Sequence, residues 1–280
     1  MVIAHGSSSL AAGAGDSITA MEISQHIAAL ERDGALLADA AASAGLTEEV
    51  PACPGWRVRD LVRHQAFVHA WAARHLTECP ADVIEEAAED DILGGGPPDG
   101  ELIAAYREGH AALVRVLRAA DPDVRCATFL PAPSPLAFWA RRQAHETAIH
   151  RFDAQSTRRA APPVPRDAFD PGFAADGIDE MVRGFAARQK ADGVPGELLV
   201  RSVDTGDAWR FTWPSEGAVR TRRYRAGEET GPADCVLAGP ASGVYLFLWN
   251  RCAAAGADIA ITGDHGILRT WNRRVRVRWT

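Results

Sequence analysis

The chain has 280 residues, 47% of them hydrophobic, which is enough for one large or two ordinary domains with buried cores. Its 30 Lys and Arg against 37 Asp and Glu give a net charge of −7, which argues against nucleic-acid or anionic-membrane partners, because these favour a basic protein. No apolar run approaches the ~20 residues of a membrane-spanning helix, and the five cysteines form no Cys-x-x-Cys pair. We therefore expect a cytoplasmic protein with reduced thiols.

The first 157 residues are predicted to contain a leader and four long helices. Residues 1–20 are rich in Gly, Ser and Ala, and we expect them to be a disordered leader. Apolar residues at helical spacing predict helices over residues 23–44, 58–77, 101–120 and 135–154. Ser134 is the expected N-cap of the last helix, with Pro135 at its first position. Four long amphipathic helices joined by loops predict an antiparallel four-helix bundle over residues 21–157.

The second half of the chain has a different pattern. Residues 158–166 contain three prolines and are predicted to be a linker. Further helices are predicted over residues 176–191, 242–254 and 266–271, and strands over 198–203, 208–213, 218–224, 235–238, 259–262 and 274–279. This mixture predicts a small α+β domain over residues 167–280 and an α+β fold class for the whole chain.

Two of the predicted bundle helices carry a possible metal-ligand set. Glu146 and His150 are four residues apart, so both side chains project from one face of their helix, one turn apart. His64 lies on the apolar stripe of the second helix. If these helices pack together, two imidazoles and a carboxylate converge and leave coordination positions open, as in a catalytic site for a divalent metal.

Spacing alone leaves other interpretations open. Glu22 and His26 have the same separation, which shows that it arises readily by chance. Glu146 and His150 would otherwise be a surface pair worth roughly 0.3–0.5 kcal/mol, and His64 a hydrogen-bonded core residue. Three other histidines are further candidate ligands: His69, His75 and His110. His110 is also a candidate base. His145 is set aside as a ligand, because it is adjacent to Glu146 and points elsewhere.

The strings around these residues resemble a known family. Residues 50–57 (VPACPGWR) with His64, and residues 145–153 (HETAIHRFD), are similar to the maleylpyruvate isomerase family of thiol-dependent metalloenzymes. Residues 239–251 and 261–265 are similar to the family's sterol-carrier-like carboxy-terminal region. The resemblance implies a DinB-like four-helix bundle followed by that smaller domain.

The resemblance also implies a ligand set and a cosubstrate. It places a divalent metal, with zinc as the expected ion, on His64, Glu146 and His150. Together with a composition in which Lys190 is the only lysine and arginine and alanine abound, as in GC-rich coding sequences, it implies mycothiol as the thiol. None of the chain's own cysteines is then required.

The predicted chemistry follows from that ligand set. Two neutral imidazoles and one carboxylate leave a bound divalent metal with residual positive charge, which stabilises a thiolate at neutral pH. A thiolate can add to an activated alkene, permit rotation and leave, which is cis–trans isomerisation, or it can displace a leaving group, which is S-transfer. We therefore predict a mycothiol-dependent isomerase or S-transferase acting on a small electrophile. The alternatives are a metal-dependent hydrolase without thiol and a non-catalytic protein that binds metal or a small molecule.

Three charged residues are given roles around this site. Arg251 follows a predicted apolar helix, and we predict that its guanidinium lies near the cleft as a catalytic group that binds a carboxylated substrate or cosubstrate. Asp153 is predicted to accept a hydrogen bond from a ligand histidine, and Arg151 to support the same helix.

Overall fold

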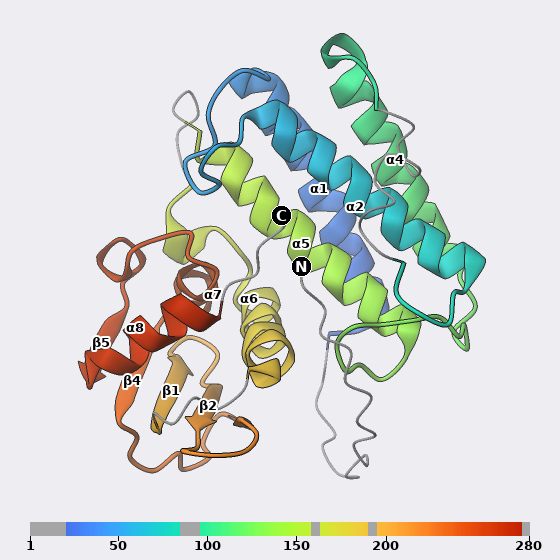
Figure 1. Ribbon diagram of the computed structural model, residues 1–280. Coiled ribbons are helices and arrows are strands. Elements are labelled where there is room, and N and C mark those ends of the chain that lie inside the picture. Colours follow the sequence, from blue (N-terminus) through green and yellow to red (C-terminus); the bar gives the residue numbers. More distant parts are fainter. Residues whose placement is uncertain (1–20, 85–95, 158–162, 190–194, 276–280) are drawn as a thin grey trace.

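Four long helices form the amino-terminal part of the protein, in a computed structural model that describes residues 21–84, 96–157, 163–189 and 195–275 (Figure 1). They are α1 (Ile23–Ala44), α2 (Val58–Glu78), α4 (Asp99–Ala119) and α5 (Pro135–Gln155). Each begins and ends within two residues of its predicted bounds, so the helix predictions are confirmed. The predicted leader, residues 1–20, lies outside the described residues, as do residues 158–162 of the predicted linker.

The local sequence explains where these helices begin. The Ser134 hydroxyl accepts a hydrogen bond from the backbone N–H of Ala137 at 3.1 Å, and Pro135 occupies the first helical position of α5, as predicted. At the start of α2, the Asp60 carboxylate accepts a hydrogen bond from the backbone N–H of Arg57 at 2.8 Å. Both contacts satisfy backbone donors that the first turn leaves without partners.

Helix α5 differs from the predicted amphipathic helix because it is buried on all sides. Its buried residues run from Leu136 to Ala154 and include charged ones, among them Arg142 and Glu146. Helices α1 and α2 cover one side, and the carboxy-terminal domain covers the polar side that would otherwise face solvent. The polar groups of α5 must therefore find partners within the protein.

The carboxy-terminal part begins with α6 (Pro171–Asp179), followed by a π-helical segment η3 (Glu180–Phe185) and a short 3-10 helix η4 (Ala186–Arg188). The helix that was predicted to begin at residue 176 begins five residues earlier, at Pro171, so the predicted start is wrong. The Asp170 carboxylate caps the helix by accepting a hydrogen bond from Phe173 N at 3.0 Å, and Pro171 follows it at the first position.

Within the described residues, five strands form one mixed sheet in the order β3-β2-β1-β4-β5, in which β1 and β4 are the parallel pair and the other neighbours are antiparallel. The strands are β1 (Gly196–Ser202), β2 (Ala208–Trp213), β3 (Arg220–Tyr224), β4 (Cys235–Gly239) and β5 (Ala260–Gly263). All five were predicted from sequence, and the α+β fold class is confirmed.

The remaining helices are α7 (Ala241–Leu248), α8 (His265–Arg274) and the short 3-10 helices η2 (Pro165–Asp167) and η5 (Ala254–Ala257). The strand predicted from residue 274 is wrong at its start, because Arg274 ends α8. Trp271 anchors that helix by packing its buried ring against Phe211 and Trp213 of β2. Residues 276–279 lie outside the described residues.

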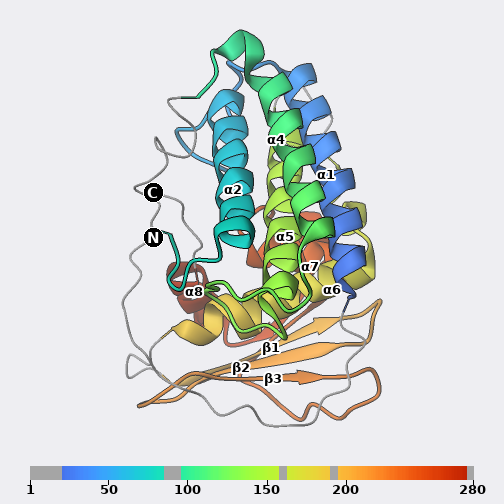
Figure 2. The same cartoon turned by 90° about the vertical axis from the view of Figure 1, so that its right-hand side faces the viewer.

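The molecule has three layers: the bundle, the helices α6, α7 and α8, and the sheet (Figure 2). Tyr245 of α7 reaches His145 of α5, with 3.1 Å between its hydroxyl oxygen and His145 Nδ1. The bundle and the second domain thus share a polar contact in their common interior. In the part of the chain that the structure describes, no helix is both long and apolar enough to span a membrane.

The close packing of α7 predicts that Gly243→Ala destabilises the protein. A Cβ atom at this buried position would lie 2.5 Å from the carbonyl oxygen of Ala257, so the backbone would have to shift. We expect the free energy of unfolding to fall by about 1–3 kcal/mol, measured by urea denaturation. Gly109→Ala in α4 is the matched control, because its Cβ meets no described atom within 4 Å, and it is expected to be neutral or slightly stabilising. Equal losses in both variants would contradict this account of α7.

Candidate metal centre

The structure brings together the three residues predicted as metal ligands. His64 comes from α2, and Glu146 and His150 come from α5. The Nε2 atoms of His64 and His150 lie 3.3 and 3.2 Å from the same oxygen, Glu146 Oε1. The predicted convergence of the two helices is therefore present, and the role of the residues as metal ligands stays a prediction.

This arrangement fits a divalent cation. Two imidazole nitrogens and a carboxylate oxygen form a donor set that catalytic zinc sites use. Bonds of about 2.0–2.2 Å to a tetrahedral ion place neighbouring donor atoms about 3.3–3.5 Å apart, which is close to the separations found here. One ligand atom from each residue lies within 4.8 Å of the others. Three such ligands leave coordination positions for a further group.

The carboxylate of Glu146 is buried but has charged partners on both oxygens. Arg142 Nη2 donates to Glu146 Oε2 at 2.9 Å, and Arg142 also pairs with Glu180 of the carboxy-terminal part. Burial alone would raise the pKa of Glu146, but the hydrogen bonds of both histidines and the charge of Arg142 hold it well below its ordinary value. Arg142 thereby occupies Oε2 and leaves Oε1 to His64 and His150.

His150 is oriented by a carboxylate and an arginine behind it. Its Nδ1 lies 2.9 Å from Asp153 Oδ2, so the predicted contact between Asp153 and this histidine is present. Arg251, from the turn after α7, donates from Nε to Asp153 Oδ1 at 2.8 Å and from Nη2 to Oδ2 at 2.9 Å. This chain of contacts turns His150 Nε2 toward Glu146, as histidine ligands of metals require.

Arg251 therefore lies beside the site, as predicted, and it contacts Asp153, Cys53 and the Trp249 carbonyl. Its Nη1 donates to the Trp249 carbonyl at 2.8 Å, and 13% of its side chain is exposed. Its predicted catalytic role stays a prediction, and these contacts favour action through Asp153 on His150. Arg151 pairs with Asp33 of α1, with 3.1 Å between Nε and Oδ1, which agrees with its predicted support of the helix.

The loop between α1 and α2 supplies two residues to which sequence reasoning gave no role in the site. The thiol of Cys53 lies 3.6 Å from Asp153 Oδ2 and 3.9 Å from Arg251 Nη2. The indole of Trp56 stacks on His150, with ring centroids 6.2 Å apart, and is tilted against His64 at 5.1 Å. Both residues belong to the Cys-Pro-Gly-Trp string on which the resemblance rests, and that string was the available signal.

A pocket adjoins this loop. It has a volume of about 410 Å³ and is lined by residues of the segment 49–57, including Trp56, Glu49 and Arg57. Trp56, which packs on His64 and His150, is the residue that the pocket shares with the surroundings of these histidines.

The other candidate histidines of the bundle lie outside this cluster. His69 contacts the Thr147 hydroxyl at 2.9 Å, and His110 lies 3.3 Å from the Glu31 carbonyl. His75 accepts a hydrogen bond from Ile84 N at 3.1 Å and contacts the Trp71 carbonyl at 2.9 Å. Burial lowers the pKa of each of the three imidazoles. All three lie outside the described clusters of possible metal ligands, and their roles as ligands or as a base stay untested predictions.

The sequence matches two family models. Residues 27–155 match the mycothiol maleylpyruvate isomerase N-terminal domain, and residues 172–270 match the corresponding C-terminal domain. A search of curated proteins found no match.

Two solved structures have a similar fold. A crystal structure of the mycothiol-dependent maleylpyruvate isomerase has a TM-score of 0.56 and 13% sequence identity, over 83% of this chain and 90% of the other. A histidine-to-alanine mutant of that enzyme has a TM-score of 0.57 and 13% identity, over 86% and 93% of the two chains. At this identity the likeness establishes a common fold.

The burial of Asp153 predicts a pH-dependent contribution to stability. Burial would raise its pKa, but Arg251 and His150 lower it from 3.8 to about 2. Because the folded pKa lies below the unfolded one, the contribution is present above pH 3.8 and is lost as the pH falls through about 2. In metal-free protein, Asp153→Asn is expected to lower the free energy of unfolding at pH 7 by about 2 kcal/mol or more.

The measurement is denaturant unfolding of wild type and Asp153→Asn between pH 7 and pH 2. The difference in the free energy of unfolding between the two proteins should become smaller below pH 4. The exposed Asp123→Asn serves as control and should change stability by less than about 0.5 kcal/mol at pH 7. A difference that is independent of pH would contradict the assignment of an ionised Asp153.

Proposed function

Because the chain belongs to the mycothiol maleylpyruvate isomerase family, we propose that it is an enzyme that uses mycothiol and a bound divalent metal to act on a small electrophile. The reaction is cis–trans isomerisation of the maleylpyruvate type or S-transfer. The observation that supports this proposal is the convergence of His64, Glu146 and His150 between α2 and α5.

The three residues would hold the metal, with zinc as the expected ion. When bound, the metal supplies a Lewis acid that favours the thiolate form of the cosubstrate at neutral pH. Glu146 contributes the single negative charge of the donor set, and Arg142 keeps that carboxylate ionised and oriented. Asp153 and Arg251 hold His150 in the orientation that the set requires.

The surroundings of the cluster provide a place for the cosubstrate. The pocket of about 410 Å³ has in its wall Trp56, which packs on both histidines, and Glu49 and Arg57 add polar groups. Some 10% of the His64 side chain is exposed, against 4% of His150 and 2% of Glu146, so His64 is the most exposed of the three. We assign the thiol to this pocket and the electrophile to the adjoining space.

The proposed isomerisation needs no external oxidant or reductant. The thiolate sulfur forms a C–S bond with one alkene carbon, the remaining C–C single bond rotates, and the C–S bond breaks to return the thiolate. In S-transfer the C–S bond persists and a leaving group departs with the electron pair. Both reactions begin with the same attack, so the substrate's leaving group decides between them.

Removal of the histidines should abolish activity. The double variant His64→Ala/His150→Ala is expected to lose one bound metal per chain and to reduce kcat/KM at least 100-fold, because two of three ligands are gone. Metal content is measured by mass spectrometry and folding by circular dichroism. The exposed His265→Ala is the control and should keep both metal and activity. A double variant with unchanged metal content and activity would refute the proposal.

The dependence on thiol is tested by calorimetric titration of mycothiol into metal-loaded and chelated protein. Binding that requires the metal is expected. A metal that is indifferent to mycothiol would favour a hydrolase, which turns over without thiol, or a non-catalytic binding protein.

Substitution of Cys53 tests whether the reacting thiol is mycothiol or the protein's own Cys53. The Cys53 thiol donates toward Asp153, which a serine hydroxyl can also do. Cys53→Ser is therefore expected to retain kcat/KM within about threefold and to remain dependent on mycothiol, as measured by steady-state kinetics with varied thiol. Loss of turnover in a variant that keeps its metal would instead make the Cys53 sulfur a reactant.

A further inference from the structure

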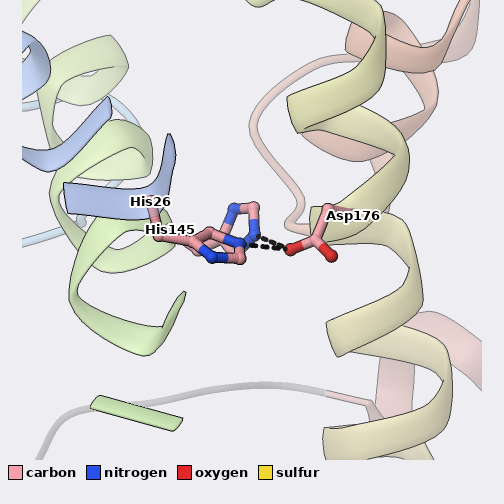
Figure 3. A group of neighbouring side chains, drawn as sticks. All are labelled: His26, His145 and Asp176. Atoms are coloured by element: carbon pink, nitrogen blue, oxygen red, sulfur yellow. Dashed lines mark hydrogen bonds and ion pairs between the residues drawn. The ribbon is translucent and has the colours of Figure 1, made fainter. Parts of the chain in front are cut away.

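A second cluster of two histidines and a carboxylate lies between the bundle and the carboxy-terminal domain. Figure 3 shows His26 and His145 on one side, both directed at Asp176 on the other. The Nε2 atoms of His26 and His145 lie 3.0 and 2.8 Å from Asp176 Oδ2. The three residues come from α1, α5 and α6, and each is more than nine-tenths buried.

We propose that His26, His145 and Asp176 bind a second divalent cation of the zinc class. The donor set has the same composition as the first cluster, two imidazole nitrogens and one carboxylate oxygen, within 4.8 Å of one another. The two clusters share no residue. Although His145 directly precedes Glu146 in α5, successive side chains on a helix point about 100° apart, so each faces a different side of the helix.

His145 has the outer hydrogen-bond partner that metal-bound histidines commonly have. Its Nδ1 lies 3.1 Å from the Tyr245 hydroxyl, and that hydroxyl lies 3.4 Å from the backbone carbonyl of His145. With Nε2 directed at a cation, Nδ1–H donates to the Tyr245 oxygen and the Tyr245 hydroxyl donates to the carbonyl. Burial raises the pKa of Tyr245 well above its ordinary value, so the phenol keeps that proton.

Asp176 is present as a carboxylate, and its arginine partner is independently anchored. Burial would raise the pKa of Asp176, but Arg141 and both histidines hold it well below its ordinary value. Arg141 Nε donates to Asp176 Oδ2 at 2.8 Å, while its Nη2 donates to the Asp176 backbone carbonyl at 2.6 Å and to Asp179 Oδ2 at 3.3 Å. Arg141 therefore retains partners when the Asp176 carboxylate turns to a cation.

The cluster also borders a cavity through which a cation can enter. This cavity has a volume of about 500 Å³, and its wall includes His26, Asp176 and Arg141 together with apolar groups such as Leu130 and Phe138. A cation held by three protein ligands has open positions, and here they would face a space large enough for a small ligand. Because its ligands come from α1, α5 and α6, the cation would also link the bundle to the second domain.

The test is the zinc content of full-length protein after equilibration with Zn²⁺ and removal of excess. We expect two zinc ions per chain in wild type, one in His26→Gln, one in His64→Ala/His150→Ala, and none when all three substitutions are combined. Asp176→Asn should behave as His26→Gln does, and circular dichroism checks that each variant is folded. The exposed His265→Gln is the matched control and should keep two ions.

The outcomes separate this proposal from the first. One ion in wild type and none in His64→Ala/His150→Ala would overturn the second site. His26, His145 and Asp176 would then only hold α6 against the bundle through hydrogen bonds. One ion in both proteins, lost in His26→Gln, would support the second site and refute the first. Cobalt substitution of His64→Ala/His150→Ala identifies the ligands, and absorption bands from thiolate coordination would overturn the assignment, because no cysteine belongs to this cluster.

Discussion

The burial of one charge, the Glu146 carboxylate, organises the centre of this protein. An isolated buried carboxylate costs several kcal/mol, and the protein offsets that cost with two imidazoles on one oxygen and Arg142 on the other. Arg142 is itself buried, so it needs a second anion, which Glu180 provides, and its guanidinium lies against the rings of Phe185 and Trp249. Glu146 therefore requires Arg142, and Arg142 requires Glu180, which lies outside the bundle.

This compensation makes the carboxy-terminal domain part of the candidate metal centre. Glu180 belongs to η3 and Arg251 follows α7, yet they support Glu146 and His150 through Arg142 and Asp153. The bundle alone would leave charged groups of α5 without partners on its covered side. A small second domain that packs against α5 is therefore a requirement of the site as well as an addition to the core.

The two histidine–carboxylate clusters differ in one respect that bears on their chemistry. Arg142 occupies the oxygen of Glu146 that the histidines do not use, whereas Arg141 shares Asp176 Oδ2 with His26 and His145. In the first cluster, the arginine therefore does not contact the carboxylate oxygen that faces the two histidines. The second has a competing cation beside its carboxylate, so it is expected to bind metal less tightly than the first.

The sequence by itself predicted most of the helices and strands, and it predicted that His64, Glu146 and His150 come together. Helical periodicity, the Ser134–Pro135 start and the four-residue spacing of Glu146 and His150 are local properties, and local properties survive in the folded chain. Only the tertiary structure decided the contacts between Arg251 and Asp153, 98 residues apart, and between His26 and Asp176, 150 residues apart. No periodicity specifies such pairs, because they depend on how the second domain packs against α5.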